Sequence, residues 1–478
     1  MEGIVMADFD KISINRTYYN VKDTTARQQI SAETAAREQA DSQLSQQIIE
    51  QTAATGRLLT SFGAVGDGQT DDSVALKNAI ETCSRNGISL YIDDKTFYVA
   101  SLFYAECTKP VKIIGLGNAT IKTAKYRYGT ASPIPGQQFV SYINIKAPTV
   151  SFDNLHFTGS AGLQWDSEIA NMYFDNPILF YNCQQVRVVN CNFANLWGTS
   201  VYITDSTKTE VYFGNCDWTE VGGHYKVIDA YDMFGDAVDL DRLGMCNIVF
   251  DSCNAAGRAK NVVASGFDVS RCFMTCEFGN GVYNITFNSC NIQNYERVLH
   301  SEYVGNVKVV FNSTHIKNAV LFCFNYTDTS AVTEAVFISC DIMPIDKATW
   351  NGASGFCYDA VTVINSVFHC KTDYICDSTK ACFINCDVQL DTYPTAKLTI
   401  NKKANSYTLF DNCTFNLSNA TLIGFTIASG AKVCFVSGFI WKTASSFDMG
   451  GARTLFMEPL TGTPSGWSNY GVVEWTNH

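Results

Sequence analysis

The sequence predicts an all-β protein built as a parallel β-helix, and three observations lead to this fold class. The first is a short unit that recurs along the chain, in which alternating apolar residues precede Asn or Ser, then Cys, then Asn or Asp. The second is the composition, with 46% hydrophobic residues, 31 Phe and 23 Tyr but only nine Pro among 478 residues, which excludes wholesale disorder. The third is the alternation inside the unit, which has the period of a strand and not that of a helix.

Two N-terminal segments differ from the rest of the chain. The first segment, residues 1–20, contains most of the alternating stretch Ile12–Val21, which predicts a short strand or hairpin. Residues 21–57 contain no Phe, Trp or Tyr, and they show the 3-4 spacing of a coiled-coil helix that ends at Gly56. Its seam positions are Ile30, Thr34, Arg37, Asp41, Leu44, Ile48 and Gln51. Because so polar a helix should be unstable alone, we expect it to pair with copies of itself; a solvated helix or linker is the alternative.

A glycine-rich turn and a short helix follow. Residues 62–80 read FGAVGDGQTDDSVALKNAI. Asp71 or Asp72 can cap the helix and Gly87 ends it, which predicts a capping helix over residues 71–86. Extended segments come next, so the helix is suited to cover the end of a parallel sheet. A phosphate-binding turn is the alternative, but its Gly-Lys-Ser/Thr signature is absent.

This segment resembles the start of the pectate-lyase-like right-handed β-helix domain, which is common in phage tailspikes and in polysaccharide-cleaving enzymes. The resemblance rests on the match of residues 62–80 to the pattern GAxGDGxTDDxxAxxxA. It implies that the segment shapes the N-terminal cap of a right-handed solenoid. It also implies that Asp67, Asp71 and Asp72 are structural and not catalytic.

The recurring unit places a Cys or Thr at one equivalent position in each coil. These positions are 191, 216, 253, 290, 314, 340, 386 and 413. The base period lies in the mid-twenties, with insertions, as in a solenoid. We expect the β-helix domain to span residues 58–437, with residues 438–478 as a C-terminal cap or trimer contact. A β-sandwich with regularly spaced strands is the alternative.

The unit also predicts the corners and the interior of the coils. Asn before Cys suits a tight corner, because Asn tolerates a left-handed backbone. The nineteen cysteines, which include no CxxC pair, are expected to be buried free thiols in inward ladders with Phe, Val and Ile. A disulfide framework is the alternative, and it would require an oxidising compartment.

Two adjacent coils lengthen to 37 residues, Cys216–Cys253 and Cys253–Cys290, and their extra residues must leave as loops, which often carry function. Counting fourteen residues back from the Cys position aligns Tyr202, Asp239 and His300, with Asp268 from the coil between them. Since alternate strand residues share a face, the next column holds Thr204, Asp241 and Glu302.

Strands in neighbouring coils lie about 4.8 Å apart, so carboxylates in these columns match the separations used in glycoside hydrolysis. We therefore expect a catalytic cluster of Asp239, Asp241, Asp268, His300 and Glu302. The stretches GDAVDLD and GFDVS also resemble the Asp-bearing strands of polygalacturonase-type β-helices, which implies acid and base roles for Asp239 and Asp268. A solvated acidic loop is the simplest alternative, and a Ca²⁺ site is another; we expect no cofactor and assign no metal ligand.

Further residues on the same coils are candidates for substrate binding, because aromatic rings stack on sugar faces and carboxylates accept hydrogen bonds from sugar hydroxyls. They are Trp197, Tyr202, Trp218, Tyr231 and Asp236. The aromatic members could instead simply pack the loops.

The succession of these elements resembles a trimeric phage tailspike or tail fibre. The resemblance implies a homotrimer whose residues 1–20 attach to baseplate or tail proteins and whose β-helix binds host cell-surface polysaccharide. It implies cleavage of that polysaccharide by hydrolysis or lyase chemistry. A non-catalytic receptor-binding fibre is the principal alternative, and a secreted carbohydrate-active enzyme is a further one.

Charge and hydropathy limit the partners and the compartment. A net charge of −12 argues against nucleic acid as a partner. No stretch approaches the ~20 apolar residues of a membrane span, so we expect no membrane insertion. Residues 1–10 lack the apolar region of a signal peptide. We therefore expect the protein to fold in a bacterial cytoplasm and to function in a virion tail or another extracellular particle.

Overall fold

The computed structural model describes most of the solenoid and short parts of the N-terminal segment. The described residues are 11–14, 17–20, 31–37, 39–41, 43, 56–137, 139–160, 173–204, 208–222, 226–231, 244–258, 270–326, 332–344, 355–369, 374–376, 378–389, 397–401, 405–416, 424–427, 432–435, 440–442, 453–456 and 473–475. The chain divides into two units, Met1–Gly56 and Arg57–His478. In the part of the chain that the structure describes, no helix combines the length and apolar character that crossing a membrane requires.

The first unit contains a hairpin and a helical stretch. Strands β1 (Lys11–Ile14) and β2 (Thr17–Asn20) pair antiparallel, as the alternation in this segment predicts. Residues 31–37, 39–41 and 43 are helical and exposed. Within this helix Arg37 donates a hydrogen bond of 2.7 Å to Glu33, one turn earlier. The pairing of this helix with other copies stays a prediction.

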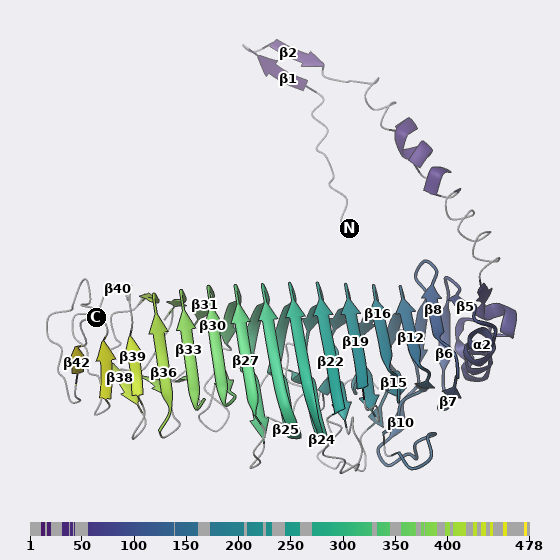
Figure 1. Cartoon of the computed structure of the whole chain (residues 1–478). Helices are drawn as coiled ribbons and strands as arrows, with labels where there is room; N and C mark the ends of the chain where they lie inside the picture. Colours follow the sequence, from purple (N-terminus) through teal and green to yellow (C-terminus); the bar gives the residue numbers. More distant parts are fainter. Residues whose placement is uncertain are drawn as a thin grey trace. The chain divides into compact units, whose positions relative to one another are not determined.

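The second unit begins with the predicted cap. Its elements are β3 (Gly56–Leu58), the 3-10 helix η1 (Leu59–Phe62), β4 (Asp67–Asp71) and α2 (Ser73–Asn86). Helix α2 lies at one end of the row of strands (Figure 1). It ends at Gly87, which has a φ of 69° and closes the helix in the left-handed region.

The acidic residues of the cap accept hydrogen bonds from its backbone. Asp72 stands at the N-cap of α2, but its carboxylate accepts from the N–H groups of Val65 (2.7 Å) and Gly66 (3.2 Å) and not from the helix. Asp71 accepts from the N–H groups of Ser73 (3.0 Å) and Ala100 (3.0 Å). The two carboxylates therefore tie the glycine-rich turn, the helix and the first coil together, which is the structural role expected for this motif.

We expect Asp71→Asn to lower the stability of the cap, with an effect that depends on pH. Burial disfavours the ionised form of Asp71, but hydrogen bonds from Ser73, Ser101 and Ala100 outweigh it and hold the pKa of this carboxyl below its ordinary value. The stabilisation is therefore complete above the ordinary pKa near 4 and is lost as the pH falls through the lower folded-state pKa. Thermal unfolding should show a deficit of about 1 kcal/mol at pH 7 that shrinks toward pH 3. An equal deficit at both pH values would contradict this prediction.

Three lines of parallel strands follow the solenoid, and most of its described coils contribute a strand to each line. One line carries the candidate site, and its strands are β7 (Phe103–Glu106), β11 (Ile143–Lys146), β15 (Ile178–Tyr181), β18 (Val201–Thr204), β21 (Lys226–Tyr231), β24 (Ser270–Asn288), β25 (Asn291–Asn312), β26 (His315–Tyr326), β29 (Gly355–Cys357), β32 (Tyr374–Cys376), β35 (Lys397–Asn401) and β38 (Gly424–Ile427). Strands β24, β25 and β26 are long enough to turn corners, so β24 also pairs in the second line, β26 also pairs in the third, and β25 pairs in all three.

The other two lines complete the coils. The second contains β5 (Ser89–Ile92), β8 (Val111–Gly115), β12 (Thr149–Asp153), β16 (Gln185–Val189), β19 (Lys208–Gly214), β22 (Gly244–Asp251), β27 (Thr333–Ile338), β30 (Ala360–Ile364), β33 (Lys380–Ile384), β36 (Tyr407–Asp411), β39 (Lys432–Phe435), β41 (Arg453–Phe456) and β42 (Val473–Trp475). The third contains β4, β6 (Thr96–Val99), β9 (Thr120–Thr123), β13 (His156–Thr158), β17 (Asn192–Ala194), β20 (Asp217–Thr219), β23 (Asn254–Ala256), β28 (Asp341–Pro344), β31 (Val367–His369), β34 (Asp387–Gln389), β37 (Thr414–Asn416) and β40 (Ile440–Lys442).

Two further details concern the borders of this domain. Strands β10 (Tyr126–Arg127) and β14 (Tyr173–Phe174) form a separate antiparallel pair beside the coils. Strands β40, β41 and β42 continue the parallel pairing beyond residue 437. The solenoid therefore extends past the expected boundary, because strand alternation persists where the Cys-containing unit has faded.

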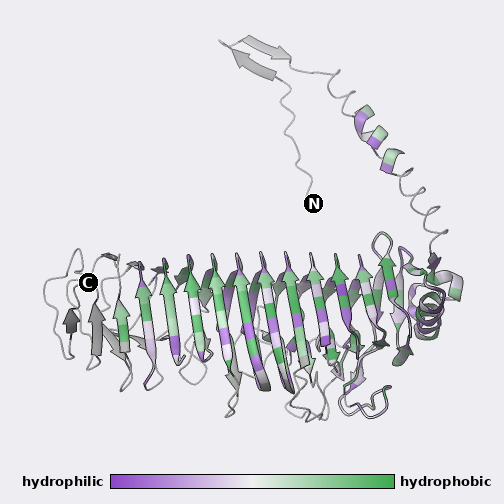
Figure 2. Cartoon of the chain, in the orientation of Figure 1, coloured by the Kyte–Doolittle hydropathy of each residue, from purple (hydrophilic) through white to green (hydrophobic). Residues whose placement is uncertain are grey.

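The interior is a set of aromatic and aliphatic ladders. Bands of hydrophobic and hydrophilic residues alternate along the strands (Figure 2), as expected where one face of each strand is buried. The best-formed ladder stacks five Phe rings with centroid separations of 4.5–4.9 Å: Phe213, Phe250, Phe287, Phe311 and Phe337. These separations equal the strand spacing, so each ring packs on its equivalent in the next coil.

The corner before each Cys has the left-handed backbone that the sequence predicts. Positive φ values near 50° occur at Asn190, Asn215, Ser252, Ser289, Ser313, Ser339, Asn365, Asn385 and Asn412. The Asn side chains also bond from coil to coil. The amide of Asn412 donates to Asn385 at 2.7 Å, and that of Asn385 donates to Asn365 at 3.1 Å.

The cysteines next to these corners are free, and this leads to a testable count. Sixteen cysteines in the described residues form no disulfide, and all of them except Cys382 are buried. Burial raises the pKa of Cys246 to about 12, so this thiol stays protonated and unreactive. Thiol titration after denaturation without reductant should detect nearly all nineteen. Six or more disulfides would overturn this expectation and the expected cytoplasmic folding with it.

Candidate functional site

A row of polar residues crosses four neighbouring strands of the first line. Direct backbone pairing aligns Tyr202 of β18, Asp229 of β21, Thr275 of β24 and His300 of β25. The adjoining row holds Thr204, Tyr231, Glu277 and Glu302. Tyr202 with His300, and Thr204 with Glu302, therefore share rows as the sequence register predicts.

The register differs from the prediction inside the two long coils. The position expected for Asp239 belongs to Asp229, because the extra residues 232–243 come after strand β21, and a count back from Cys253 passes through them. The position expected for Asp268 belongs to Thr275, because the second insertion precedes β24. The predicted residues Asp236, Asp239, Asp241 and Asp268 lie outside the described residues, so their roles stay predictions.

A buried ion-pair cluster lies at the first of these rows. The Lys226 ammonium is 3.2 Å from a carboxylate oxygen of Asp229 and also bonds to the Glu277 carboxylate. Asp229 is 0% exposed, and its burial raises the pKa of this carboxyl to about 7, although Lys226 favours the ionised form. Burial alone would lower the pKa of Lys226, but Asp229 and Glu277 raise it above its ordinary value. Lys226 therefore stays protonated, and its ammonium group pairs with the carboxyl groups of both Asp229 and Glu277.

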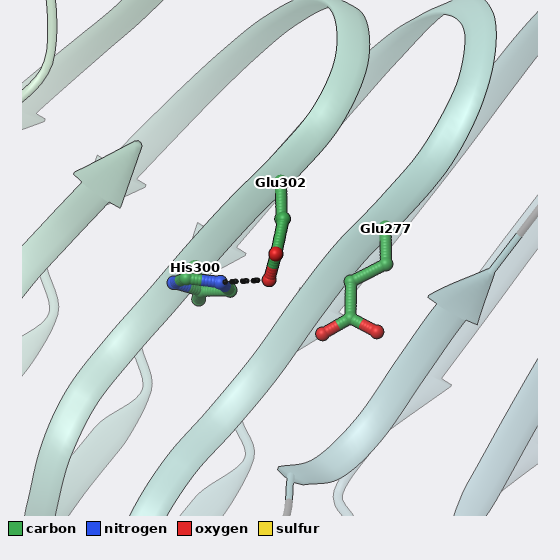
Figure 3. A group of neighbouring side chains, drawn as sticks. All are labelled: Glu277, His300 and Glu302. Atoms are coloured by element: carbon green, nitrogen blue, oxygen red, sulfur yellow. Dashed lines mark hydrogen bonds and ion pairs between the residues drawn. The ribbon is translucent and has the colours of Figure 1, made fainter. Parts of the chain in front are cut away.

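A second hydrogen-bonded chain runs along β25. A guanidinium nitrogen of Arg297 lies 3.1 Å from His300 Nδ1, and His300 Nε2 lies 3.1 Å from Glu302 Oε2. Because a guanidinium can only donate, Nδ1 accepts, and the neutral imidazole donates its Nε2–H to Glu302 (Figure 3). Burial lowers the pKa of His300, with Arg297 contributing and Glu302 opposing. The hydrogen bond from His300 lowers the pKa of Glu302, which is therefore ionised at neutral pH.

These two groups open into one small pocket of about 230 Å³. It is lined by Lys226, Arg271, Cys272, Thr275, Glu277, Arg297, His300 and Glu302. One oxygen of Glu277, one oxygen of Glu302 and a ring nitrogen of His300 lie within 4.8 Å of one another, with the two Glu on neighbouring strands (Figure 3). Such a set could ligate a cation, but the positive charges of Lys226, Arg271 and Arg297 on the same walls oppose one. The pocket is better suited to a polar organic ligand.

The aromatic residues predicted to bind substrate have different positions. Tyr202 lines a second cavity, and its ring centroid is 5.2 Å from that of Phe139. Trp197 and Trp218 are 0% and 1% exposed, so their predicted role as exposed sugar-stacking rings is wrong. The Trp218 ring stacks on Phe193 in the interior at a centroid distance of 5.4 Å. Tyr231 pairs through its backbone with Thr204 and Glu277, but its side chain lies outside the described part.

Four residues of the site were not among those predicted from the sequence: Lys226, Asp229, Glu277 and Arg297. A usable signal existed for Glu277. It lies 25 residues before Glu302, and Thr275 lies 25 residues before His300. This spacing is the base period of the solenoid. Counting back one period from His300 and Glu302 therefore leads to Thr275 and Glu277 on the neighbouring strand β24. Asp229 and Lys226 lie beyond both insertions, where no constant spacing applies.

Comparison with known proteins identifies the fold. No protein-family model matches the chain, and no curated protein does. A double mutant of the tailspike protein of E. coli bacteriophage HK620 is 11% identical with a TM-score of 0.50, and the match covers 89% of this chain and 81% of that one. PfbA, a surface adhesin of Streptococcus pneumoniae, is 12% identical with a TM-score of 0.46, and the match covers 82% and 92%. The tailspike protein of Acinetobacter phage vB_ApiP_P1 is 12% identical with a TM-score of 0.41, and the match covers 88% and 62%.

The first of these similarities agrees with the parallel strand pairing described above. The predicted fold class and the resemblance to tailspike-type β-helices are confirmed by this likeness. The chain is a right-handed parallel β-helix of the type found in phage tailspikes.

Proposed function

We propose that this protein is a tailspike or tail-fibre component that binds cell-surface polysaccharide and hydrolyses it in the pocket of Glu277 and Glu302. One observation carries the proposal: two carboxylates on paired strands approach within 4.8 Å in a pocket that also offers hydrogen-bond donors. Retaining glycosidases use two carboxyl groups about 5–5.5 Å apart. The resemblance of the sequence to tailspike-type β-helices, which implies a polysaccharide ligand, supports the choice of a glycan.

The surroundings of the two carboxylates suit different roles. Glu302, which the neutral His300 holds ionised, is placed to act as nucleophile or base. The Lys226 ammonium pairs with two carboxyl groups, those of Asp229 and Glu277. Because burial raises the pKa of Asp229, this cluster tends to retain one carboxyl proton near neutral pH. Glu277 is the carboxyl of this cluster that reaches the pocket, so it faces the leaving oxygen, and Lys226 links it to the proton that Asp229 retains.

A binding-only fibre is the second candidate, and a specific observation favours it. Both carboxylates already have partners, since Lys226 bonds to Glu277 and His300 bonds to Glu302. Groups held in this way can serve as fixed acceptors for sugar hydroxyls. Incubation with surface polysaccharide extracted from the host separates the candidates. New reducing ends indicate hydrolysis, an unsaturated product indicates a lyase, and binding without product indicates an adhesin.

We also propose a homotrimer that joins baseplate or tail proteins through residues 1–20. The support is the polar 3-4 seam of residues 21–57 and the exposed helix within it. Sedimentation velocity of the full chain should give three times the mass of one chain at micromolar concentration. Removal of residues 1–56 should weaken this assembly. A full-length chain that sediments as a monomer would refute the proposal.

A further inference from the structure

A second and larger cavity lies beside the candidate site. Its volume is about 710 Å³, within the range of cavities that hold drug-sized ligands. It is formed by β10 and the segment that follows to Val140, by Phe174 and Asn176, and by Thr199 and Tyr202. Five aromatic side chains line it: Tyr126, Tyr128, Phe139, Phe174 and Tyr202.

The rings of this cavity form two contacting groups. Phe174 lies between Tyr126 and Tyr128, with centroid distances of 5.9 Å and 6.3 Å. Phe139 packs against Tyr202 at 5.2 Å. Tyr128 is 52% exposed although it carries a large ring. Rings held at an opening can stack on the apolar face of a ligand without first being ordered.

The polar groups of the cavity are almost all uncharged. Asn176 is fixed, because its amide donates to Val140 O at 3.1 Å and its oxygen accepts from Thr199 N at 2.7 Å. The buried Thr199 hydroxyl lies near the Tyr202 hydroxyl. Within the described residues it has no hydrogen-bond partner that meets the usual distance and angle criteria. Lys226 is the single charged residue on the described walls, and Asp229 and Glu277 already neutralise it. An anionic ligand would therefore find no uncommitted cation here.

The cavity and the carboxylate pocket share Lys226 and lie in order along the solenoid. Tyr202 and His300 occupy the same row, with strands β21 and β24 between their strands. At about 4.8 Å per strand, their strands are about 14 Å apart. A linear polymer that lies parallel to the solenoid axis can thus occupy both places at once.

We infer that the aromatic cavity is a second sugar-binding subsite, which takes an uncharged pyranose residue of the polysaccharide whose neighbouring residues occupy the carboxylate pocket. The inference rests on the proposed function and adds the class of sugar and the direction of the chain. Pyranose rings offer an apolar face to aromatic rings and hydroxyl groups to Thr199 and Tyr202. Binding in the cavity would fix the register of the polymer over Glu277 and Glu302.

The test combines a footprint with binding measurements on the full chain. Surface polysaccharide extracted from the host serves as the probe, and hydroxyl-radical labelling is read by mass spectrometry with and without it. Tyr128 and Phe139 should be protected, whereas Tyr407, which is exposed on the remote strand β36, should not be. Tyr128→Ala and Phe139→Ala should each weaken binding about tenfold or more, and Tyr407→Ala should not. A neutral oligosaccharide fragment of the probe should also compete better than tetragalacturonate.

The outcomes separate this inference from the function on which it rests. Protection of peptides with Glu277 and Glu302, but not of Tyr128 or Phe139, would overturn the second subsite and leave the proposed function standing. Stronger competition by tetragalacturonate would overturn the assignment of an uncharged sugar. A footprint without any protection, together with no measurable binding, would overturn both.

Discussion

Replacement of Glu302 by Gln should lower the rate of polysaccharide cleavage about 100-fold or more while the affinity for the polysaccharide changes far less. Gln keeps the shape of the side chain and accepts a hydrogen bond from His300, but it cannot attack or take a proton. Initial rates of reducing-end release, together with calorimetric binding to the same polysaccharide, measure the two effects separately.

Glu277→Gln should lower the rate by a similar factor, because the amide cannot donate the proton that the leaving oxygen needs. The matched control is Glu334→Gln on β27, which removes an exposed carboxylate 3.5 Å from Lys308 and outside the pocket. This control should cleave like the wild type. Undiminished cleavage by both pocket variants would exclude the proposed carboxylate pair.

The pH dependence of cleavage follows from the same cluster. Glu302 must be ionised, and its pKa is lowered, so this requirement is met down to acidic pH. The proton that Asp229 retains is lost as the pH rises through the raised pKa of this carboxyl, about 7. The rate should therefore fall above neutral pH, and Asp229→Asn should alter this basic limb. A flat profile across neutral pH would contradict the proposed proton donor.

The catalytic residues predicted from the sequence provide a separate test. The sequence register and the resemblance to strands of polygalacturonase-type β-helices both point to Asp239 and Asp268. Asp239→Asn and Asp268→Asn would abolish cleavage if these residues carry the chemistry, and would leave most of it if Glu277 and Glu302 do. The four single variants therefore decide between two sites on the same coils.

The fold was predictable because each coil repeats the same physical solution. A residue with a left-handed backbone turns the corner, the next Cys is buried, and an inward aromatic or aliphatic residue follows on the next strand, as at Asn190, Cys191 and Phe193. The same repeat held the signal for Trp218. It stands where Phe193 stands one coil earlier, and it stacks on that ring in the interior. Its position in the repeat outweighs the general tendency of Trp to bind sugars.

The candidate site was predictable only where the coils have the base length. His300 and Glu302 are predictable because no insertion separates them from the Cys-equivalent position 314. In the two long coils a loop can leave at more than one corner, and the two insertions differ in this respect: residues 232–243 follow β21, whereas residues 259–269 precede β24. A one-residue irregularity between Gly279 and Val282 shifts the register once more. The spacing of residues in the sequence does not reveal at which corner a loop leaves the coil or where such an irregularity lies.

The aromatic ladder leads to the largest expected effect on stability. Phe250 is 0% exposed, and its ring lies between those of Phe213 and Phe287 at centroid distances of 4.9 Å and 4.7 Å. Phe250→Ala removes both contacts and leaves a cavity that the rigid coils cannot close, so it should destabilise the protein by about 3–5 kcal/mol. Denaturant unfolding followed by circular dichroism measures this loss, or the unfolding rate does so if refolding is incomplete. Val249→Ala, a partly exposed neighbour on the same strand, should cost much less.

Each coil contacts only its neighbours. The losses of stability from two Phe→Ala changes should therefore be coupled in adjacent coils and independent in distant coils. Phe250→Ala combined with Phe287→Ala should cost less than the sum of the two single changes, since the contact between these rings is lost in either one. Phe250→Ala combined with Phe383→Ala should be additive, because Phe383 stacks on Phe410 in distant coils. Additivity in the adjacent pair would show that the stacked rings do not stabilise one another. The ladder would then contribute only through the burial of each ring.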